Sequence, residues 1–129
     1  MVVFRIERRG GLPAYLQIVH QVEQALRMGA LAEGDKLPTA AQVAATTKVN
    51  PNTTLKAYRE LERSGLVEVR QGAGTFITRS LATPQTAPES PLRARLGEWM
   101  REAREQGLSE HDVTTLFEAA FTETFHKAL

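Results

Sequence analysis

The sequence contains no cysteine, a single tryptophan and no apolar run long enough to cross a membrane. Without cysteine the chain cannot form a disulfide scaffold, a thiolate zinc site or a cysteine nucleophile, and this composition fits a reducing compartment. The longest apolar stretches are far shorter than the ~20 residues that a membrane helix requires. At the N-terminus, the charges follow a short apolar patch and no small-residue cleavage site is evident, unlike a secretory signal. The sequence therefore predicts a cytoplasmic protein without a membrane segment.

Patterns that are typical of enzymes and metal sites are also lacking. The three histidines, at positions 20, 111 and 126, fall on separate predicted helices without the spacing of metal ligands. Ser109 and these histidines do not suggest a catalytic triad. Gly72-Ala73-Gly74 is not followed by a helix, as a phosphate-binding glycine loop would be. We therefore expect no metal, no cofactor and no catalytic activity.

The net charge is only +1, but the basic residues are concentrated in the middle of the chain. Residues 36–80 carry seven basic and three acidic side chains, whereas residues 81–129 carry five basic and eight acidic ones. A polyanion is therefore attracted to the central segment and repelled by the C-terminal one. Taken alone, this distribution fits a solvated surface about as well as a nucleic-acid binding surface.

A proline-rich segment divides the chain into two parts. Residues 81–91, LATPQTAPESP, contain three prolines and almost no bulky apolar residue. Such a composition cannot bury a core and predicts a linker. Residues 1–80 are then one domain, and residues 92–129 are a second, helical segment.

The first part begins with two predicted helices. Pro13 suits the first position of a helix, because the amide that it lacks would be unpaired there, and Gly29 is a natural C-terminal stop. Apolar residues follow Pro13 at helical spacing, namely Leu16, Val19, Val22 and Leu26. Thr39 and Gln42 form a capping box that starts the second helix, which runs to about residue 47.

The third predicted helix begins at Asn50, an N-cap residue followed by proline, and ends at Ser64-Gly65. One arc of this helix is expected to face the core through Leu55, Tyr58 and Leu61. The opposite arc is expected to face solvent through Thr53, Lys56, Ala57 and Glu60, flanked by Asn52, Arg59 and Arg63.

A β-hairpin follows the third helix. Residues 66–70 and 75–78 are β-rich runs joined by a glycine-containing connection at residues 71–74. Three helices followed by such a hairpin are the plan of a winged helix-turn-helix, whose last helix enters the DNA major groove. The predicted fold class is therefore mainly α with a small β-hairpin, a winged helix-turn-helix followed by a C-terminal two-helix dimerisation segment.

Residues 13–78 resemble the DNA-binding domain of the GntR family of bacterial regulators. The matching stretches are PAYLQI at 13–18, GALAEGDKLPT at 29–39 and VNPNTTLKAYRELERSGLVEVRQGAGTFIT at 49–78. The VNPNT and KAY sequence motifs, together with only two helices after the linker, resemble the YtrA subgroup. The resemblance implies a transcriptional regulator, a repressor that binds a pseudo-palindromic operator as a homodimer.

The position match with this family also implies the DNA contacts. They are Thr39, Asn50, Asn52, Thr53, Lys56, Arg59, Arg70, Gln71, Gly72, Gly74 and Thr75. The chain departs from the family at Ala40 and Ala41, where an acidic or apolar residue and then arginine are usual. Because the resemblance implies that this arginine contacts DNA, the sequence leaves open whether the family's usual operator preference applies.

The second part predicts two helices, at residues 92–106 and 110–127. Ser109 and Asp112 form a variant capping box for the last helix, which carries three phenylalanines on one face. A 38-residue segment is too small to bury this face alone. A dimer core is therefore predicted, formed by Trp99, Val113, Leu116, Phe117, Phe121 and Phe125. A ligand pocket lined by the same aromatic residues is the alternative.

The partners expected from the sequence are double-stranded DNA and a second copy of the chain. A small-molecule effector of unknown identity is a further possible partner, and it would have to bind between the helical pairs of the dimer. Winged helices also occur in assembly domains. The alternative function is therefore a protein-interaction module that does not bind DNA.

Overall fold

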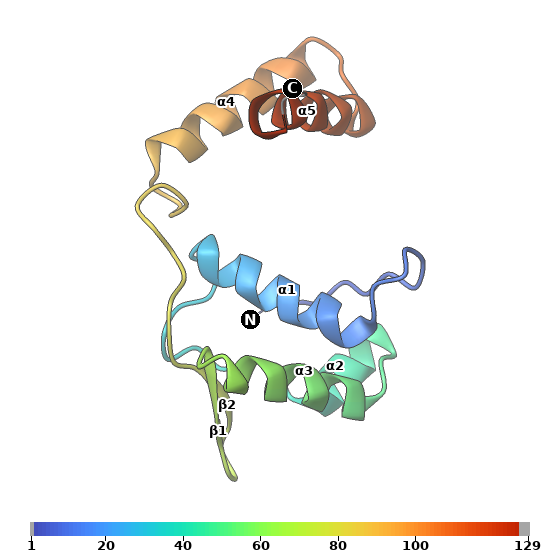
Figure 1. The fold of residues 1–129 in the computed structure, drawn as a ribbon, viewed down its shortest axis with the longest axis vertical. Helices are drawn as coiled ribbons and strands as arrows, with labels where there is room; N and C mark the ends of the chain where they lie inside the picture. The colour runs from blue at the N-terminus through green and yellow to red at the C-terminus, as the bar shows by residue number, and fades with distance from the viewer. Residues whose placement is uncertain (1, 127–129) are drawn as a thin grey trace. The chain divides into compact units, whose positions relative to one another are not determined.

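The computed structural model describes residues 2–126, which form two compact units that divide between Pro88 and Glu89. The first unit contains α1 (Ala14–Arg27), α2 (Ala40–Thr47), α3 (Pro51–Arg63), β1 (Val67–Arg70) and β2 (Gly74–Ile77) (Figure 1). The second contains α4 (Pro91–Glu105) and α5 (Glu110–Phe125). These elements confirm the predicted mainly helical fold with a two-stranded hairpin. Residues 127–129, in which the predicted last helix and dimerisation segment end, lie outside the described residues.

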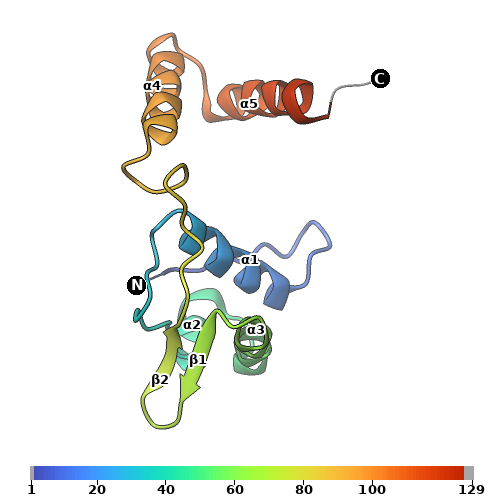
Figure 2. The same cartoon turned by 60° about the vertical axis from the view of Figure 1, so that its left-hand side comes forward.

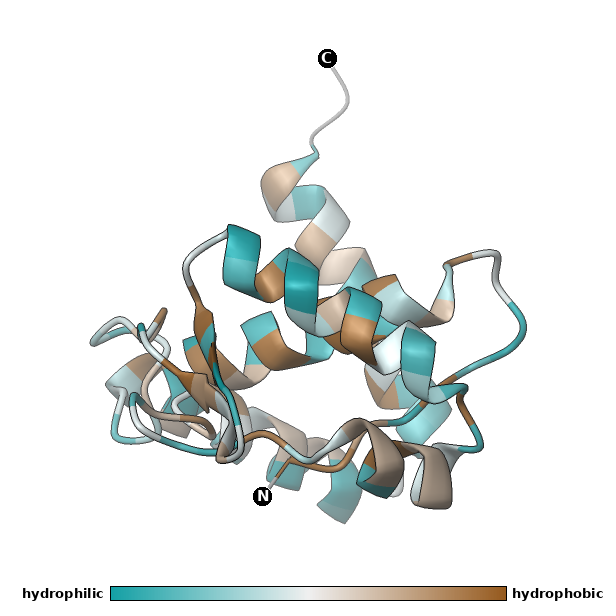
Figure 3. Cartoon of the chain, turned by 90° about the horizontal axis from the view of Figure 1, so that it is seen from below, coloured by the Kyte–Doolittle hydropathy of each residue, from teal (hydrophilic) through white to brown (hydrophobic). Residues whose placement is uncertain are grey.

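One face of each helix in the first unit builds its core. On α1, Ile18, Val22 and Leu26 are fully buried, four residues apart, and so share one face of the helix. The sequence prediction omitted Ile18 and named Leu16 and Val19, which are only half-buried. Figure 3 shows apolar and polar residues interspersed along the helices, which is the pattern of amphipathic elements.

The buried face of α3 is rotated relative to the prediction. The buried residues are Thr54, Ala57, Tyr58 and Leu61. Leu55, expected in the core, is 44% exposed, and Ala57, expected in solvent, is fully buried. Small side chains at positions 54 and 57 allow α3 to pack closely on α1 and α2, which explains why this face is turned inward.

The hairpin of β1 and β2, here called the wing, projects from the C-terminal end of α3 (Figure 2). Its strands are antiparallel, with Val67 opposite Ile77 and Val69 opposite Thr75. The other edge of β2 is covered by residues 34–37. The Leu37 N–H donates to the Thr75 carbonyl, and the Ile77 N–H donates to the Asp35 carbonyl, each at 2.8 Å. The wing is therefore anchored at its base on both sides of β2.

The segment before α1 belongs to the same core. Phe4 is buried in the hydrophobic cluster of the first unit. The side-chain amide of Gln21 bonds to the backbone N–H and carbonyl of Arg5, and that of Gln17 does the same at Glu7. Two glutamines one helical turn apart thus hold this segment along α1. Their side chains supply the hydrogen bonds that a neighbouring strand would otherwise supply.

Segments beyond the wing complete the two units. Leu81, the first residue of the predicted linker, packs against the core of the first unit.

In the second unit, the predicted capping box of Ser109 and Asp112 is confirmed. The backbone N–H of Ser109, which donates to the carboxylate at 3.0 Å, is the main cause that lowers the pKa of Asp112. Within residues 2–126, no helix has the length and apolar character needed to span a bilayer.

Candidate nucleic-acid interface

The solvent side of α3 carries a row of hydrogen-bonding and basic side chains. Opposite the buried residues lie Asn52, Lys56, Arg59 and Arg63, all of them exposed. They are spaced four, three and four residues apart, so they follow one line along the helix. We call these four residues the outward face of α3. It differs from the predicted arc, because Ala57 is buried and Thr53 and Glu60 are half-buried at its side.

The turn before α3 presents the helix N-terminus to solvent. Lys48 adopts a left-handed backbone conformation with φ 61°, and Val49 is buried. The side-chain oxygen of Asn50 accepts a hydrogen bond from the Asn52 backbone N–H at 2.8 Å, and Pro51 occupies the first turn. The two amide hydrogens of Asn50 are chemically suited to donate to a phosphate, because its oxygen already serves the cap.

Thr39 caps α2, as predicted. Its hydroxyl oxygen accepts from the Gln42 N–H at 3.1 Å, and its own N–H donates to the Gln42 side-chain oxygen at 2.8 Å. The hydroxyl hydrogen of this exposed residue can still donate to an anion. Ala41 is exposed and offers only a methyl group, so it provides no charge at the position where the family resemblance implies arginine.

Lys56 is positioned by an aromatic ring from another helix. Its ammonium nitrogen lies 4.0 Å from the centroid of the Tyr15 ring in the first turn of α1. A cation over a ring face is attracted to it, which restricts this long side chain on the outward face of α3. Sequence reasoning did not identify Tyr15 as a site residue. The contact joins positions 41 residues apart, so no local pattern indicates it.

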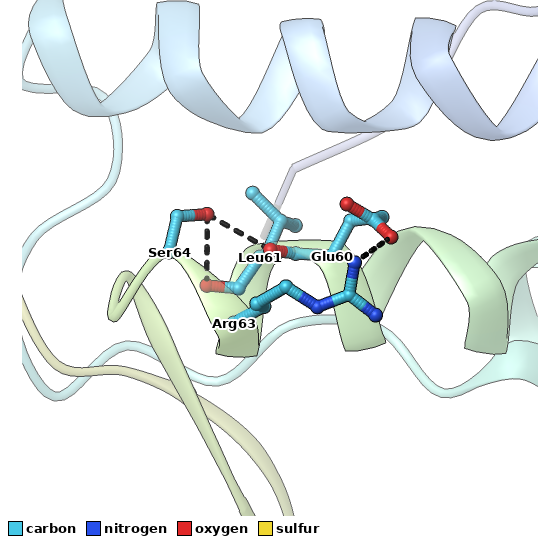
Figure 4. Close-up of polar contacts among 4 residues, drawn as sticks. All are labelled: Glu60, Leu61, Arg63 and Ser64. Atoms are coloured by element: carbon cyan, nitrogen blue, oxygen red, sulfur yellow. Dashed lines mark hydrogen bonds and ion pairs between the residues drawn. The ribbon is translucent and has the colours of Figure 1, made fainter.

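Arg63, at the far end of the outward face, is paired within its own helix. Its guanidinium contacts the Glu60 carboxylate at 3.0 Å (Figure 4). The Ser64 hydroxyl donates to the carbonyl of Glu60 at 2.8 Å and to that of Leu61 at 3.4 Å, which closes the helix end. An exposed pair of this kind contributes only ~0–1 kcal/mol, so a phosphate can compete for the arginine.

The wing divides into an open tip and an anchored base. Gln71, Gly72 and Ala73 at the tip are exposed. Gly74 and Thr75 are half-buried, and a Cβ built on Gly74 would lie 2.6 Å from Cε of Lys36. Gly74 also has φ +129°, which side-chain-bearing residues rarely adopt. Gly74 therefore also shapes the wing, and residues 71–73 are its most exposed part, whereas the contacts expected at Gly74 and Thr75 stay predictions.

Arg70 lies beside the tip and is held there by two contacts. Its Nε donates to the Glu68 carboxylate at 2.9 Å, and its guanidinium lies 4.6 Å from the centre of the Phe76 ring. Both partners are on the wing, so Arg70 keeps its charge at the tip.

Glu62 sets the wing against α3. Its carboxylate accepts a hydrogen bond from the Val69 backbone N–H at 3.1 Å, on the edge of β1 that β2 leaves free. The Thr78 hydroxyl donates to the Gly65 carbonyl at 3.0 Å and so holds the base of the wing to the end of the same helix. Sequence reasoning did not identify Glu62, because a glutamate on a helix surface is usually only solvated.

The helix-turn-helix is braced internally by Tyr58. Its hydroxyl donates to the Pro38 carbonyl at 2.5 Å, which joins α3 to the segment just before α2. Burial raises the pKa of Tyr58 far above its ordinary value, because the charged phenolate would be desolvated there. The phenol therefore remains a hydrogen-bond donor at any physiological pH.

The predicted dimerisation residues gather largely in one groove of the second unit. An apolar groove of about 430 Å³ lies between α4 and α5. It is lined by Leu96, Trp99, Phe117, Ala120, Phe121, Thr124 and Phe125. The ring centroids of Phe121 and Phe125 are 4.9 Å apart. Val113 is half-buried and lines another pocket, and Leu116 is exposed outside the groove. Within residues 2–126, no group of acidic and histidine side chains is placed to hold a metal.

Comparisons with known proteins match both the sequence and the fold. The family described as "Bacterial regulatory proteins, gntR family" matches residues 14–77, about half of the chain. The HTH-type transcriptional regulator YhcF of Bacillus subtilis (strain 168) is 39% identical over 101 residues, which cover 78% of this chain and 84% of YhcF.

Two further similarities bear on the interface. The HTH-type transcriptional repressor YtrA of the same organism is 40% identical over 81 residues, which cover 63% of this chain and 62% of YtrA. Among solved structures, the AraR DNA-binding domain in complex with operator ORX1 is 25% identical, with a TM-score of 0.54. That match covers 60% of this chain and 100% of the AraR domain.

Proposed function

Because the chain belongs to the gntR family of bacterial regulatory proteins and is YtrA-like, we propose that it represses transcription as a homodimer on a pseudo-palindromic operator. The family makes it a DNA-binding transcription regulator rather than an enzyme. Since such a regulator acts on chromosomal DNA, the cytoplasm is its proposed location. The observation that carries the proposal is the outward face of α3, an exposed row of one amide and three cations on a helix braced from behind.

The dimensions and chemistry of this face suit the major groove. A helix with its side chains is ~10–12 Å across, and the major groove of B-DNA is ~12 Å wide. Asn52, near the start of α3, has the amide that pairs with the N6 and N7 atoms of adenine. Lys56 and Arg59 follow on the same line; Lys56 would contact a phosphate, and Arg59 a phosphate or guanine. The proposed base contact is therefore at the N-terminal end of the helix.

The wing is proposed to contact the DNA backbone beside the groove. Its exposed tip, residues 71–73, has no bulky side chain, so its backbone can approach a phosphate closely. Arg70 adds a positive charge at the same place. Because Glu62 and residues 34–37 hold the wing against the first unit, tip and helix would meet the DNA together.

The homodimer is proposed to form through the second unit. Large apolar surfaces are exposed at Phe117, Phe121 and Phe125, beside Trp99. Contact between such surfaces and water is unfavourable in free energy. Burying these faces against a second copy would remove that cost and bring two outward faces of α3 to one duplex. Half-site centres would then lie about 34 Å apart, or a multiple of that distance. Binding across a promoter would exclude polymerase, and any effector would act at this helical interface.

Binding assays on single variants test the proposed role of α3 in recognising bases. The full chain is used to select duplexes from a random pool, and affinities for selected and random DNA are compared across salt concentrations. Lys56→Ala should weaken binding to both DNAs alike and lower the salt slope by about one. Asn52→Ala should weaken binding to the selected duplex by about 1–3 kcal/mol and leave random DNA nearly unaffected.

The matched control is Arg27→Ala, which removes an exposed cation in the last turn of α1, outside the outward face of α3. It should change neither specificity nor the salt slope by as much as Lys56→Ala does. Equal losses on selected and random DNA for Asn52→Ala would remove its proposed role in base recognition. If no duplex is retained even at low salt, the protein-interaction module becomes the better interpretation.

A further inference from the structure

Leu55 is an apolar side chain left in solvent on the helix that carries the outward face. It is 44% exposed, whereas the buried side of α3 is completed by Thr54, Ala57, Tyr58 and Leu61. The core therefore does not use this leucine, whose neighbours in the sequence are the buried Thr54 and the exposed Lys56.

The position of Leu55 places it at the edge of the outward face. It lies three residues after Asn52 and four before Arg59, and residues at these spacings are neighbours on a helix surface. It is also in the first half of α3, the part of such a helix that usually contacts base edges. A side chain there would lie between the amide of Asn52 and the guanidinium of Arg59.

The chemistry of Leu55 restricts what it can contact on DNA. It can neither donate nor accept a hydrogen bond, and burying a polar base edge against it would be unfavourable. The apolar group that the major groove presents is the methyl group on C5 of a pyrimidine, which thymine carries. A cytosine methylated at C5 presents the same group.

We propose that Leu55 is a specificity-determining residue that packs on a C5-methyl group in the operator, next to the base pair contacted by Asn52. This inference rests on the proposed function, in which the outward face of α3 enters the major groove. Leu55 then selects for the methyl group by excluding water from it, while its polar neighbours supply hydrogen bonds and charge.

The test couples removal of the methyl group to removal of the leucine. In the duplex selected with the full wild-type chain, each thymine in turn is replaced by deoxyuridine, which lacks only the C5-methyl group. At one position per half-site, wild-type affinity should fall about fourfold, which corresponds to the free energy of burying one methyl group. Leu55→Ala should bind the thymine and deoxyuridine duplexes equally at that position.

A matched control is available in Leu12→Ala, because Leu12 is 42% exposed and lies outside α3. This variant should keep the full wild-type sensitivity to deoxyuridine. Affinity for random DNA and the far-ultraviolet circular dichroism of Leu55→Ala should match those of wild type, which shows that the variant is folded and binds phosphates normally.

The source of the methyl group is separated by a second set of duplexes, in which operator cytosines are replaced by 5-methylcytosine. Coupling to Leu55 at a thymine identifies the unmodified base, and coupling only at 5-methylcytosine identifies the modified one; either supports the proposal. Absence of coupling at every position, in a chain that still selects a defined duplex, overturns the role of Leu55 alone. Failure to select any duplex overturns the proposed function together with it.

Discussion

Thr54 lies on α3 and has a buried hydroxyl group. Its replacement by valine should stabilise the protein. The residue is fully buried, and its Oγ1 has no hydrogen-bond partner among residues 2–126. A hydroxyl that leaves water without a new partner costs ~1–3 kcal/mol on scales derived from protein variants. Valine has nearly the same shape, so Thr54→Val replaces this hydroxyl with a methyl group without opening a cavity.

The expected gain is about 1 kcal/mol in the free energy of unfolding, the lower end of that range, because local relaxation relieves much of the penalty. For a domain of this size, a gain of that magnitude raises the melting midpoint by about 4–8 °C. Thermal and urea unfolding are followed at one fixed protomer concentration, since dimerisation adds to apparent stability. Tyrosine fluorescence is a suitable probe, because both tyrosines, Tyr15 and Tyr58, are in the first unit.

The matched control is Thr53→Val, one residue earlier on the same helix. Thr53 is only half-buried, so its hydroxyl can bond to water and its replacement should change stability by less than ~0.5 kcal/mol. Because Thr54 is buried, affinity for DNA should not change in Thr54→Val. A loss of 1 kcal/mol or more in Thr54→Val would refute the reasoning, since it would mean that the hydroxyl makes a favourable bond in the folded protein.

Two further substitutions test the braces that hold α3 and the wing. Tyr58→Phe leaves the Pro38 carbonyl without its donor and should lower the free energy of unfolding by ~1–3 kcal/mol in urea titrations. Because burial raises the pKa of Tyr58, its contribution should be complete below pH ~10, the ordinary tyrosine pKa, and should decline as pH rises further; a wild-type advantage over Tyr58→Phe that persists undiminished in strong alkali would contradict this. Gly74→Ala should destabilise by ~1 kcal/mol or more, because φ +129° is strained for alanine and its Cβ would meet Lys36. Gly72→Ala, at φ +79° with open space around it, is the comparison; its cost should come from backbone strain alone, and an equal loss at both positions would rule out a contribution from the Lys36 contact.

The starts of α2, α3 and α5, and the hairpin, followed from the sequence. Capping boxes at Thr39 and Ser109, and the N-cap at Asn50 before proline, were predicted and are confirmed. These features involve residues no more than three positions apart, so their hydrogen bonds are decided by local chemistry. The sequence placed Lys56 on the solvent side of this helix and Asn52, Arg59 and Arg63 only at its flanks, so the row that these four residues form was not predicted.

Which residues of α3 are buried was decided by the tertiary structure. The apolar character of Leu55 indicated a core position, but Thr54 and Ala57 are small enough to lie against the neighbouring helices and take that side instead. Hydrophobicity identifies an apolar residue, whereas the space between packed helices selects by volume as well. Which face of a helix is turned toward the core therefore depends on the surfaces that the helix packs against.

Contacts between distant residues depended on the fold in the same way. The Lys56 ammonium over Tyr15 and the Glu62 carboxylate at Val69 each join separate elements, and both act on the face proposed to meet DNA. Such pairs have no spacing along the chain that local geometry imposes. The sequence by itself thus determined where the helices begin and which segments carry charge, and the packed structure decided which side chains those segments present and what holds them there.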